Sequence, residues 1–316
     1  MSRDTETKRV VLLTDKKCKY DDMAKRILGT KIVIAHILVN TLDEFGEMLP
    51  EDVVSLIEGE PYVGVVPIDL GLTNAVIEES GERIIGFNTE SVEVNEGICR
   101  FDIVFYIRRK SGLQKMIINI EAQMSETEEY HLVNRGIFYC CRLISSQKGR
   151  NFTHMDYDAI LPVYSIWIVM NCKDNCFSHI HLKEDELYGD INWEGLYDAI
   201  NLFMIGLGQD VPKREEDKKL HRLLGTLFSE TMTSEEKLQI LEMEYGIPMD
   251  YEMREEVSEM CNLSEYFIQR GIEQGIEQGI EQGIATERER SETLLAEKDA
   301  IIEKLKRQLE KLNVSV

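Results

Sequence analysis

The residues best suited to chemistry in this sequence are Asp102, Glu121 and Gln123. They border two apolar runs rich in β-branched residues, Ile103–Ile107 and Met116–Ile120, which predict a β-hairpin. If the Ser-Gly pair at its centre is a two-residue turn, residues whose numbers sum to 223 face each other. The two carboxylates then lie directly opposite one another, and strand alternation puts Gln123 on the same face as Glu121.

Facing carboxylates are destabilising unless a positive group lies between them. Directly opposed positions have Cβ atoms roughly 4.5–5.5 Å apart, which suits two carboxylates that bind one divalent cation. Mg²⁺ takes hard oxygen ligands, usually one or two carboxylates together with water and substrate phosphate. We therefore expect Asp102 and Glu121 to bind Mg²⁺ or Mn²⁺, with the backbone carbonyl of Ala122 as a further candidate ligand.

A metal held in this way suits phosphodiester hydrolysis, because it lowers the pKa of a bound water and neutralises charge on a phosphate oxygen. Gln123 cannot be a general base, but its amide could orient the attacking water or bind phosphate. Arg135 and Tyr139, one helical turn apart, could bind the substrate phosphate and stabilise the transition state. By spacing alone, an Asp at a strand start and a Glu near a strand end are also common without any site.

The segments around the hairpin predict the elements that would hold these residues in place. A long helix is expected over Glu126–Lys148 and a strand covered on both faces over Ala159–Met170. The apolar side of the helix is expected to comprise Leu132, Val133, Ile137, Cys140, Cys141 and Ile144. Its cationic side is expected to carry His131, Arg135, Tyr139 and Arg142.

Upstream, helices are predicted over Lys31–Glu44 and Pro50–Glu60, and a strand within Arg83–Val94. The order helix, strand, strand, strand, helix, strand predicts an α/β core with a mixed sheet flanked by helices. We assign residues 1–30 to a polar N-terminal arm that ends in a short helix, and residues 31–207 to the core.

After Met170, four residues form a short Cys/His cluster that raises the question of a zinc site: Cys172, Cys176, His179 and His181. Their spacing fits no standard zinc pattern, so a loop at a strand edge with incidental thiols is the preferred interpretation. Helices are predicted over Trp193–Gly206, Lys218–Phe228 and Thr233–Tyr245, the last beginning with a cap-like Thr-Ser-Glu-Glu sequence. Residues 208–266 are assigned to a helical region.

The tail, residues 267–316, contains Gly-Ile-Glu-Gln three times within Gly271–Gln282. Each glycine costs a helix roughly 1 kcal/mol relative to alanine, and close approach of a second helix along the glycine stripe would recover this loss. Heptad a and d positions follow at Leu295, Lys298, Ile302, Leu305, Leu309 and Leu312. We predict a coiled coil and hence a homo-oligomer assembled through the C-terminal helix, with a solvated single helix as the alternative.

The 316 residues carry a formal net charge of −22, which taken alone argues against nucleic acid as a partner. Two segments, Arg108–Lys115 and Arg135–Arg150, are nevertheless almost purely basic, so a local basic patch is compatible with the acidic total. The seven cysteines are expected to be reduced thiols. The polar N-terminus and the shortness of the longest apolar run, Val163–Met170, predict a cytoplasmic protein without a membrane partner.

The run FDIVFYIR…MIINIEAQ, followed by NRGIFYCCRLISSQ, resembles the PD-(D/E)XK nuclease family transposases, also called recombination-promoting nucleases. The segment NTES, the run VYSIWIVMN and the Gly-Ile-Glu-Gln tail share this resemblance, which covers Lys31–Asn171 and Gln269–Ile284. It implies a restriction-endonuclease-like fold and metal-dependent cleavage of DNA.

Carried onto this sequence, the family pattern assigns its two acidic positions to Asp102 and Glu121. Gln123 stands where the wider superfamily has a lysine, a departure that puts the water-activation step in doubt. The superfamily often has a further acidic residue upstream, for which Glu44 and Glu90 are both candidates.

Two other classes of function stay open. The chain could be a catalytically silent DNA- or protein-binding module that assembles through its coiled coil, which the net charge and the missing lysine favour. It could also be a purely structural acidic oligomer, which would require its own carboxylates to neutralise the basic segments.

Overall fold

The computed structural model describes residues 19–59, 62–63, 90–93, 97–112, 114–124, 130–149, 151–152, 155–185, 187–189, 193–214 and 218–313. Contacts divide the chain into two compact units, Met1–Cys261 and Asn262–Val316. The division predicted at residues 30, 207 and 266 is a finer one and stays a prediction.

Unit 1 contains an α/β core whose elements follow the predicted order as far as the strand Val163–Val169. Residues 19–29 are helical. The next elements are α2 (Lys31–Thr41), a 3₁₀ turn η1 (Asp43–Phe45), α3 (Pro50–Val54), β1 (Tyr62–Val63), β2 (Glu90–Glu93), β3 (Gly97–Arg100), β4 (Ile103–Arg108) and β5 (Lys115–Gln123). They are followed by α4 (Leu132–Ser145), η2 (Tyr157–Ala159), β6 (Val163–Val169), β7 (Cys176–His181), β8 (Ile200–Gly206), α5 (Lys219–Phe228), α6 (Ser234–Tyr245) and the start of α7 (Tyr251–Asn313).

The main sheet is mixed and has the strand order β1-β4-β5-β6-β8-β7. Its centre is parallel, because β5 pairs with β6 and β6 with β8 in the same direction, whereas the outer pairs are antiparallel. The mixed α/β class is therefore confirmed. A separate two-stranded ribbon pairs β2 with β3 directly before the hairpin.

The predicted register of the β4–β5 hairpin is confirmed. Ile103 pairs with Ile120 and Arg108 with Lys115, and each pair sums to 223. The turn is longer than the predicted two-residue loop, because Arg109 N donates to Gln114 O and Gly112 N donates to Arg109 O. Gly112 has φ +73, a left-handed conformation that glycine adopts without steric cost and that lets the longer turn close.

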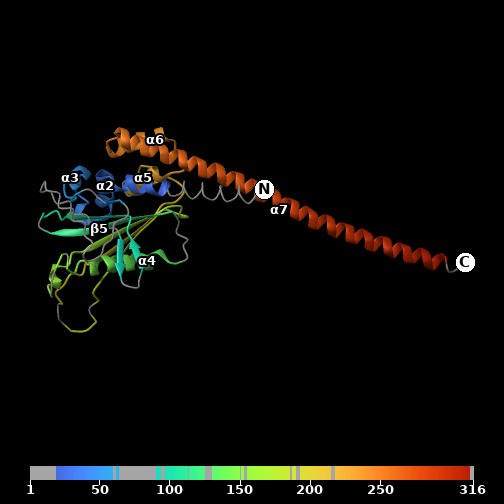
Figure 1. The fold of residues 1–316 in the computed structure, drawn as a ribbon, viewed down its shortest axis with the longest axis horizontal. Helices are drawn as coiled ribbons and strands as arrows, with labels where there is room; N and C mark the ends of the chain where they lie inside the picture. Colours follow the sequence, from blue (N-terminus) through green and yellow to red (C-terminus); the bar gives the residue numbers. More distant parts are fainter. Residues whose placement is uncertain are drawn as a thin grey trace. The chain divides into compact units, whose positions relative to one another are not determined.

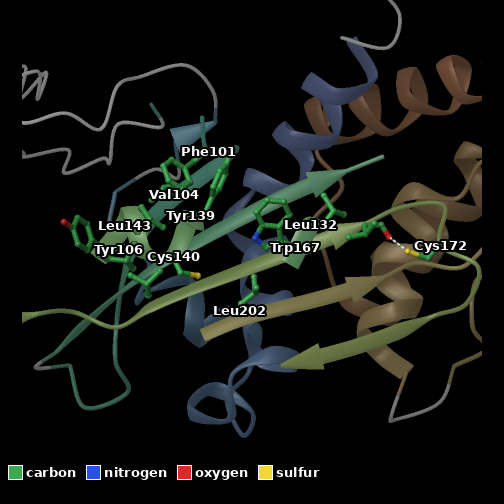
Figure 2. Close-up of a cluster of buried hydrophobic side chains, with 13 residues drawn as sticks. Phe101, Val104, Tyr106, Leu132, Tyr139, Cys140, Leu143, Trp167, Cys172 and Leu202 are labelled. Atoms are coloured by element: carbon green, nitrogen blue, oxygen red, sulfur yellow. Dashed lines mark hydrogen bonds between the residues drawn. The ribbon is translucent and has the colours of Figure 1, made fainter. Parts of the chain in front are cut away.

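Helices cover both faces of the sheet. Figure 1 shows α2, α3 and α5 on one side of β5 and α4 on the other. Strand alternation gives Val104, Ile117, Trp167 and Leu202 to the α4 side, where they pack with Tyr139 and Leu143 in one buried cluster (Figure 2). Because this is also the face of Glu121 and Gln123, α4 is the element that covers the candidate site.

The orientation of α4 differs from the predicted one. Its buried residues are Leu132, Gly136, Tyr139, Cys140, Arg142 and Leu143. Val133, Ile137 and Cys141, predicted to be buried, are exposed. The predicted cationic side is therefore turned toward the sheet, where Arg142 is buried and Arg135 is only partly exposed.

The prediction of a helix over Trp193–Gly206 is wrong, because Ile200–Gly206 forms the strand β8 between β6 and β7. Two later helices are confirmed as α5 and α6. The cap-like sequence is a capping box, in which the Thr233 hydroxyl accepts from Glu236 N and the Glu236 carboxylate accepts from Thr233 N.

Helix α7 continues without interruption through the Gly-Ile-Glu-Gln repeats to Asn313. Ile276, Ile280, Leu295 and Leu305 along it are each about half exposed or more. The helical prediction for the tail is confirmed as far as Asn313, whereas the coiled-coil pairing stays a prediction. Within the described ranges, none of the helices is long and apolar enough to cross a membrane.

Candidate active site

Asp102 and Glu121 lie together at the open end of the hairpin, as the register predicts. Asp102 N donates to Glu121 Oε1 at 3.2 Å, and Ala122 N donates to Asp102 Oδ2 at 2.9 Å. Each carboxylate therefore accepts a backbone N–H from the strand that carries the other. These reciprocal bonds extend the hairpin by one pair and fix both side chains on rigid strand ends.

A lysine that the sequence did not single out lies against this pair. Lys25 Nζ is 2.9 Å from Asp102 Oδ1 and 2.6 Å from Asp21 Oδ2. Lys25 and Asp21 stand one turn apart on the helix of residues 19–29, whose Met23, Ile27 and Leu28 are buried in the core. The predicted polar arm is therefore, from residue 19 onward, a packed helix that supplies a cation to the candidate site.

The Glu121 side chain is fully buried, and only one of its two carboxylate oxygens accepts a hydrogen bond from a described residue. Among the described residues its Oε2 has no partner with hydrogen-bond geometry, although Oε1 accepts from Asp102 N. Burial raises the pKa of Glu121 well above its usual value, and the negative charge of Asp102 raises it further. The N–H of Asp102 and the positive charge of Arg135 act in the opposite direction.

The pKa of Asp102 is also raised, and burial is again the largest cause. The charge of Lys25 and the hydrogen bond from Ala122 N oppose this shift, whereas the charge of Asp21 adds to it. The pKa of Lys25 is raised although burial acts to lower it, because the charge of Asp102 stabilises the ammonium. An ammonium and two carboxylates thus share one largely buried corner of the fold.

Arg135 closes the other side of the pair. Its Nε and Nη2 donate to the Tyr139 hydroxyl at 3.1 and 2.8 Å, and its Nη1 donates to the Tyr130 hydroxyl at 3.0 Å. A longer contact of 3.5 Å joins Nη1 to Gln123 Oε1. The guanidinium also lies 5.3 Å from the Trp167 ring centre. The structure therefore brings Arg135 and Gln123 to the site, while Tyr139 is buried behind Arg135 and positions it.

Buried polar side chains lie beneath Glu121 on the same face of the sheet. Asn119 Nδ2 and Trp167 Nε1 both donate to Ser165 Oγ at 2.9 Å. Asn119 is fully buried, and its amide stabilises the charged form of Glu121. This row fixes the strands that carry the site, because each buried donor would be costly to leave unpaired.

The donor set at the hairpin end fits a hard divalent cation. Glu121 Oε2 is a buried carboxylate oxygen to which no described residue donates a hydrogen bond, and Asp102 contributes the second carboxylate. Ala122 N points toward Asp102, and the carbonyl of a strand residue points to the same edge as its N–H. No group of three or more His, Cys, Asp or Glu side chains within the described ranges could hold a metal. Water and phosphate would have to supply the other ligands.

One of the two candidate acidic helpers lies at the wrong end of the hairpin. Glu44 Oε1 accepts from Lys110 N at 2.8 Å, at the tip of the turn. From Asp102 to Arg108 the strand alone covers six positions, or roughly 20 Å at 3.3 Å per residue, and the tip lies beyond Arg108. Glu90 pairs through its backbone with Arg100, two residues before Asp102, so only Glu90 keeps a position near the site. The side chain of Glu90 is not among the parts of the chain that the structure describes.

Carboxylates of the same chain pair with the basic residues at the hairpin tip. Arg108 and Lys115 both contact Glu58, at 2.7 and 2.6 Å. Arg109 Nη2 contacts Asp198 Oδ2 at 2.8 Å. The basic patch predicted at the tip is therefore largely neutralised within the molecule.

The Cys/His cluster does not assemble into a metal site in the described residues. His179 hydrogen-bonds Asn201 and stacks on Phe203, while Cys176 begins the edge strand β7. Cys176, His179 and His181 lie on the edge strand β7 and not in the predicted loop, and the incidental nature of the thiols stays a prediction.

Comparison of the chain with protein-family models, with curated proteins and with solved structures finds no match in any of the three.

Proposed function

We propose that this chain is a Mg²⁺- or Mn²⁺-dependent DNA endonuclease with a restriction-endonuclease-like core. The observation that carries the proposal is the paired carboxylate corner, in which Glu121 Oε2 is buried beside Asp102 and has no hydrogen-bond partner among the described residues. Such an oxygen costs about 1–3 kcal/mol unless a cation or proton occupies its vicinity. A binding site for a cation is one reason to retain it.

In this proposal Asp102 and Glu121 hold the metal, which supplies an activated water and neutralises charge on the phosphodiester. Arg135 binds the substrate phosphate, because its guanidinium is partly exposed and held in place by two tyrosine hydroxyls. Gln123 orients the attacking water from the same face. Lys25 supplies the ammonium that is missing at position 123, since it already contacts Asp102.

DNA as the substrate rests on the family resemblance, and self-assembly rests on the heptads of α7. The Gly-Ile-Glu-Gln and heptad stretches lie on one continuous helix with exposed isoleucine and leucine side chains, which supports a coiled coil between copies of the chain.

The test is nicking of supercoiled plasmid by the full chain in Mg²⁺ or Mn²⁺. We expect Asp102→Asn and Glu121→Gln to lower the nicking rate by on the order of 100-fold or more, because each removes charge that the transition state needs. The matched control is Glu287→Gln, an exposed carboxylate on α7, which should nick like the wild type. Equal nicking by all four proteins, or none by the wild type, would refute the assignment.

A second candidate is a catalytically silent DNA- or protein-binding module. The contact of Lys25 with Asp102 favours it, because an internal ammonium already balances part of the buried charge. The ion pairs at the hairpin tip also favour it, since they remove cations that could contact phosphate. A silent module would bind its partner with unchanged affinity in Asp102→Asn and would never nick plasmid.

A further inference from the structure

The thiols of Cys172 and Cys176 meet over a glycine at the edge of the sheet. In the register of the sheet, Gly206 of β8 lies between Val169 of β6 and Cys176 of β7. A Cβ atom placed on Gly206 would lie 2.5 Å from Cys176 Sγ and 3.1 Å from Cys172 Sγ. Two atoms at these distances from one point are at most 5.6 Å apart.

Gly206 is what makes this approach possible. A side chain at position 206 would displace Cys176 Sγ, since real Cβ contacts essentially never fall below 3.0 Å, and would lie in tight contact with Cys172 Sγ. The glycine follows six strand residues with larger side chains, Ile200–Ile205, so its place in β8 is not explained by strand propensity. Room for two sulfur atoms explains it.

The two cysteines differ in their exposure to solvent. Cys176 is exposed at the start of the edge strand, whereas Cys172 is buried. Cys172 Sγ donates to Val169 O at 3.4 Å, the contact drawn as a dashed line in Figure 2. An oxidant from solvent therefore reaches Cys176 first, and the thiol of Cys172 lies close enough to react with the product.

Hydrogen bonds to backbone atoms fix the positions of both cysteines, and the segment between them is short. Cys172 N donates to Leu207 O at 2.9 Å, and His221 Nε2 donates to Cys176 O at 3.0 Å. Only three residues, 173–175, separate the two cysteines. A disulfide places its two sulfur atoms about 2 Å apart, so both side chains would have to rotate toward each other as the bond forms.

This corner adjoins the candidate active site. Met170 N donates to Gln123 O at 2.7 Å, and Asn171 Nδ2 donates to Met124 O at 3.1 Å. Asn171 has φ +55, so the chain turns sharply between these contacts and Cys172. A covalent bond that pulls on residues 172–176 therefore acts on the strand end that carries Gln123.

We propose that Cys172 and Cys176 form a reversible disulfide on reaction with hydrogen peroxide, and that this bond alters the sheet edge beside Gln123. The Cys176 thiolate attacks one peroxide oxygen, which gives a sulfenic acid and water. The Cys172 thiol then attacks that sulfur, the S–S bond forms and the hydroxyl leaves as a second water. The two thiols lose two electrons and two protons, and the peroxide is reduced to two waters.

The sequence offers a sharp chemical test, because trypsin cleaves after Lys173, between the two cysteines. The products, residues 151–173 and 174–183, each contain a single cysteine, so only this disulfide can join them. The full chain is treated with hydrogen peroxide, its remaining thiols are alkylated, and the unreduced digest is analysed by mass spectrometry. We expect the joined peptide pair, its loss on treatment with dithiothreitol, and its absence from Cys172→Ser and Cys176→Ser.

The matched control is Cys141→Ser, which removes an exposed thiol on α4 and should leave the joined pair unchanged. In Cys172→Ser, dimedone should label the Cys176 sulfenic acid several-fold more than in the wild type, because the second thiol is missing. Separate peptides after peroxide treatment, or a bond from Cys176 to another cysteine, would overturn the proposal.

The second arm measures hydrogen exchange of the amides in residues 123–124 and 170–176 before and after oxidation. We expect several-fold faster or slower exchange in both segments, reversed by dithiothreitol. Unchanged exchange at residues 123–124 in a protein that carries the disulfide would overturn the link to the site. Neither arm depends on nuclease activity, so these outcomes are separate from those of the proposed function.

Discussion

The contact of Lys25 with Asp102 makes a prediction that can be worked through in energy. The two side chains are 21% and 15% exposed, so the pair is neither a surface ion pair nor a fully buried one. Exposed pairs contribute about 0–1 kcal/mol, whereas removing one partner of a buried pair costs about 3–5 kcal/mol. For Lys25→Met we therefore expect a loss of about 1–3 kcal/mol in the free energy of unfolding.

The assay is urea denaturation followed by tryptophan fluorescence. Trp167 is fully buried in the sheet, and residues 262–316 contain no tryptophan, so the signal reports on unit 1. Lys19→Met is the matched control, because Lys19 is an exposed lysine on the same helix. It should change the stability by no more than about 0.5 kcal/mol.

A double-mutant cycle isolates the ion pair from other effects of the substitution. Asp102→Asn keeps an oxygen that can accept from Ala122 N and removes the charge that Lys25 contacts. We expect a coupling energy of about 1–2 kcal/mol between Lys25→Met and Asp102→Asn. A coupling energy near zero, or equal losses in Lys25→Met and Lys19→Met, would refute the view that Lys25 is part of the site.

Three further predictions follow from other contacts. Tyr139→Phe should cost about 1.5–3 kcal/mol of stability, because the hydroxyl accepts two hydrogen bonds from the Arg135 guanidinium, and it should slow nicking by misplacing that group. Thr233→Ala should cost about 1 kcal/mol by removing the capping box of α6. Burial lowers the pKa of His36, so its contribution to stability is present above the unfolded value of about 6.5 and is lost as the pH falls. His36→Gln should flatten this dependence, whose slope is at most about 1.4 kcal/mol per pH unit.

These three predictions are measured by urea titrations, with the pH series run from pH 8 to pH 5. Tyr139→Phe with unchanged stability would mean that the Arg135 contacts contribute nothing. Parallel pH profiles for the wild type and His36→Gln would show that another group carries the dependence. Thr233→Ser, which keeps the capping hydroxyl, is the control for the helix cap and should retain the stability.

The hairpin could be predicted from the sequence because its signals are local. Alternating β-branched residues and the turn fix the register, and the register alone places Asp102 beside Glu121. The turn is longer than the predicted two-residue loop, but both are centred between Ser111 and Gly112, so the predicted register is still correct. Period-two alternation also placed Gln123 on the correct face.

Lys25 was missed because its partner is 77 residues away and no local pattern links the two. The available signal was the apolar spacing of Met23, Ala24, Ile27 and Leu28, which indicates a packed helix rather than a polar arm. Because one face of this helix is packed in the core, the directions in which its charged side chains can point are fixed. Only the tertiary structure shows that Lys25 points toward Asp102.

Two errors have the same physical origin, which is that tertiary contacts override amphipathic patterns. On α4 the side predicted to be apolar is partly exposed, while tyrosine hydroxyls and an indole ring surround Arg135 and make its partial burial favourable. In β8, Leu196, Ile200 and Phe203 are spaced as on a helix, but pairing with β6 and β7 makes a strand of Ile200–Gly206.

The most direct test of the central claim is calorimetric titration of the full chain with Mg²⁺. We expect the wild type and Glu287→Gln to bind alike, and Asp102→Asn and Glu121→Gln each to bind at least about 10-fold more weakly, because each removes a charged oxygen ligand. Chelation with EDTA should abolish nicking in parallel. Equal Mg²⁺ affinity in all four proteins would contradict a metal site at the end of the hairpin.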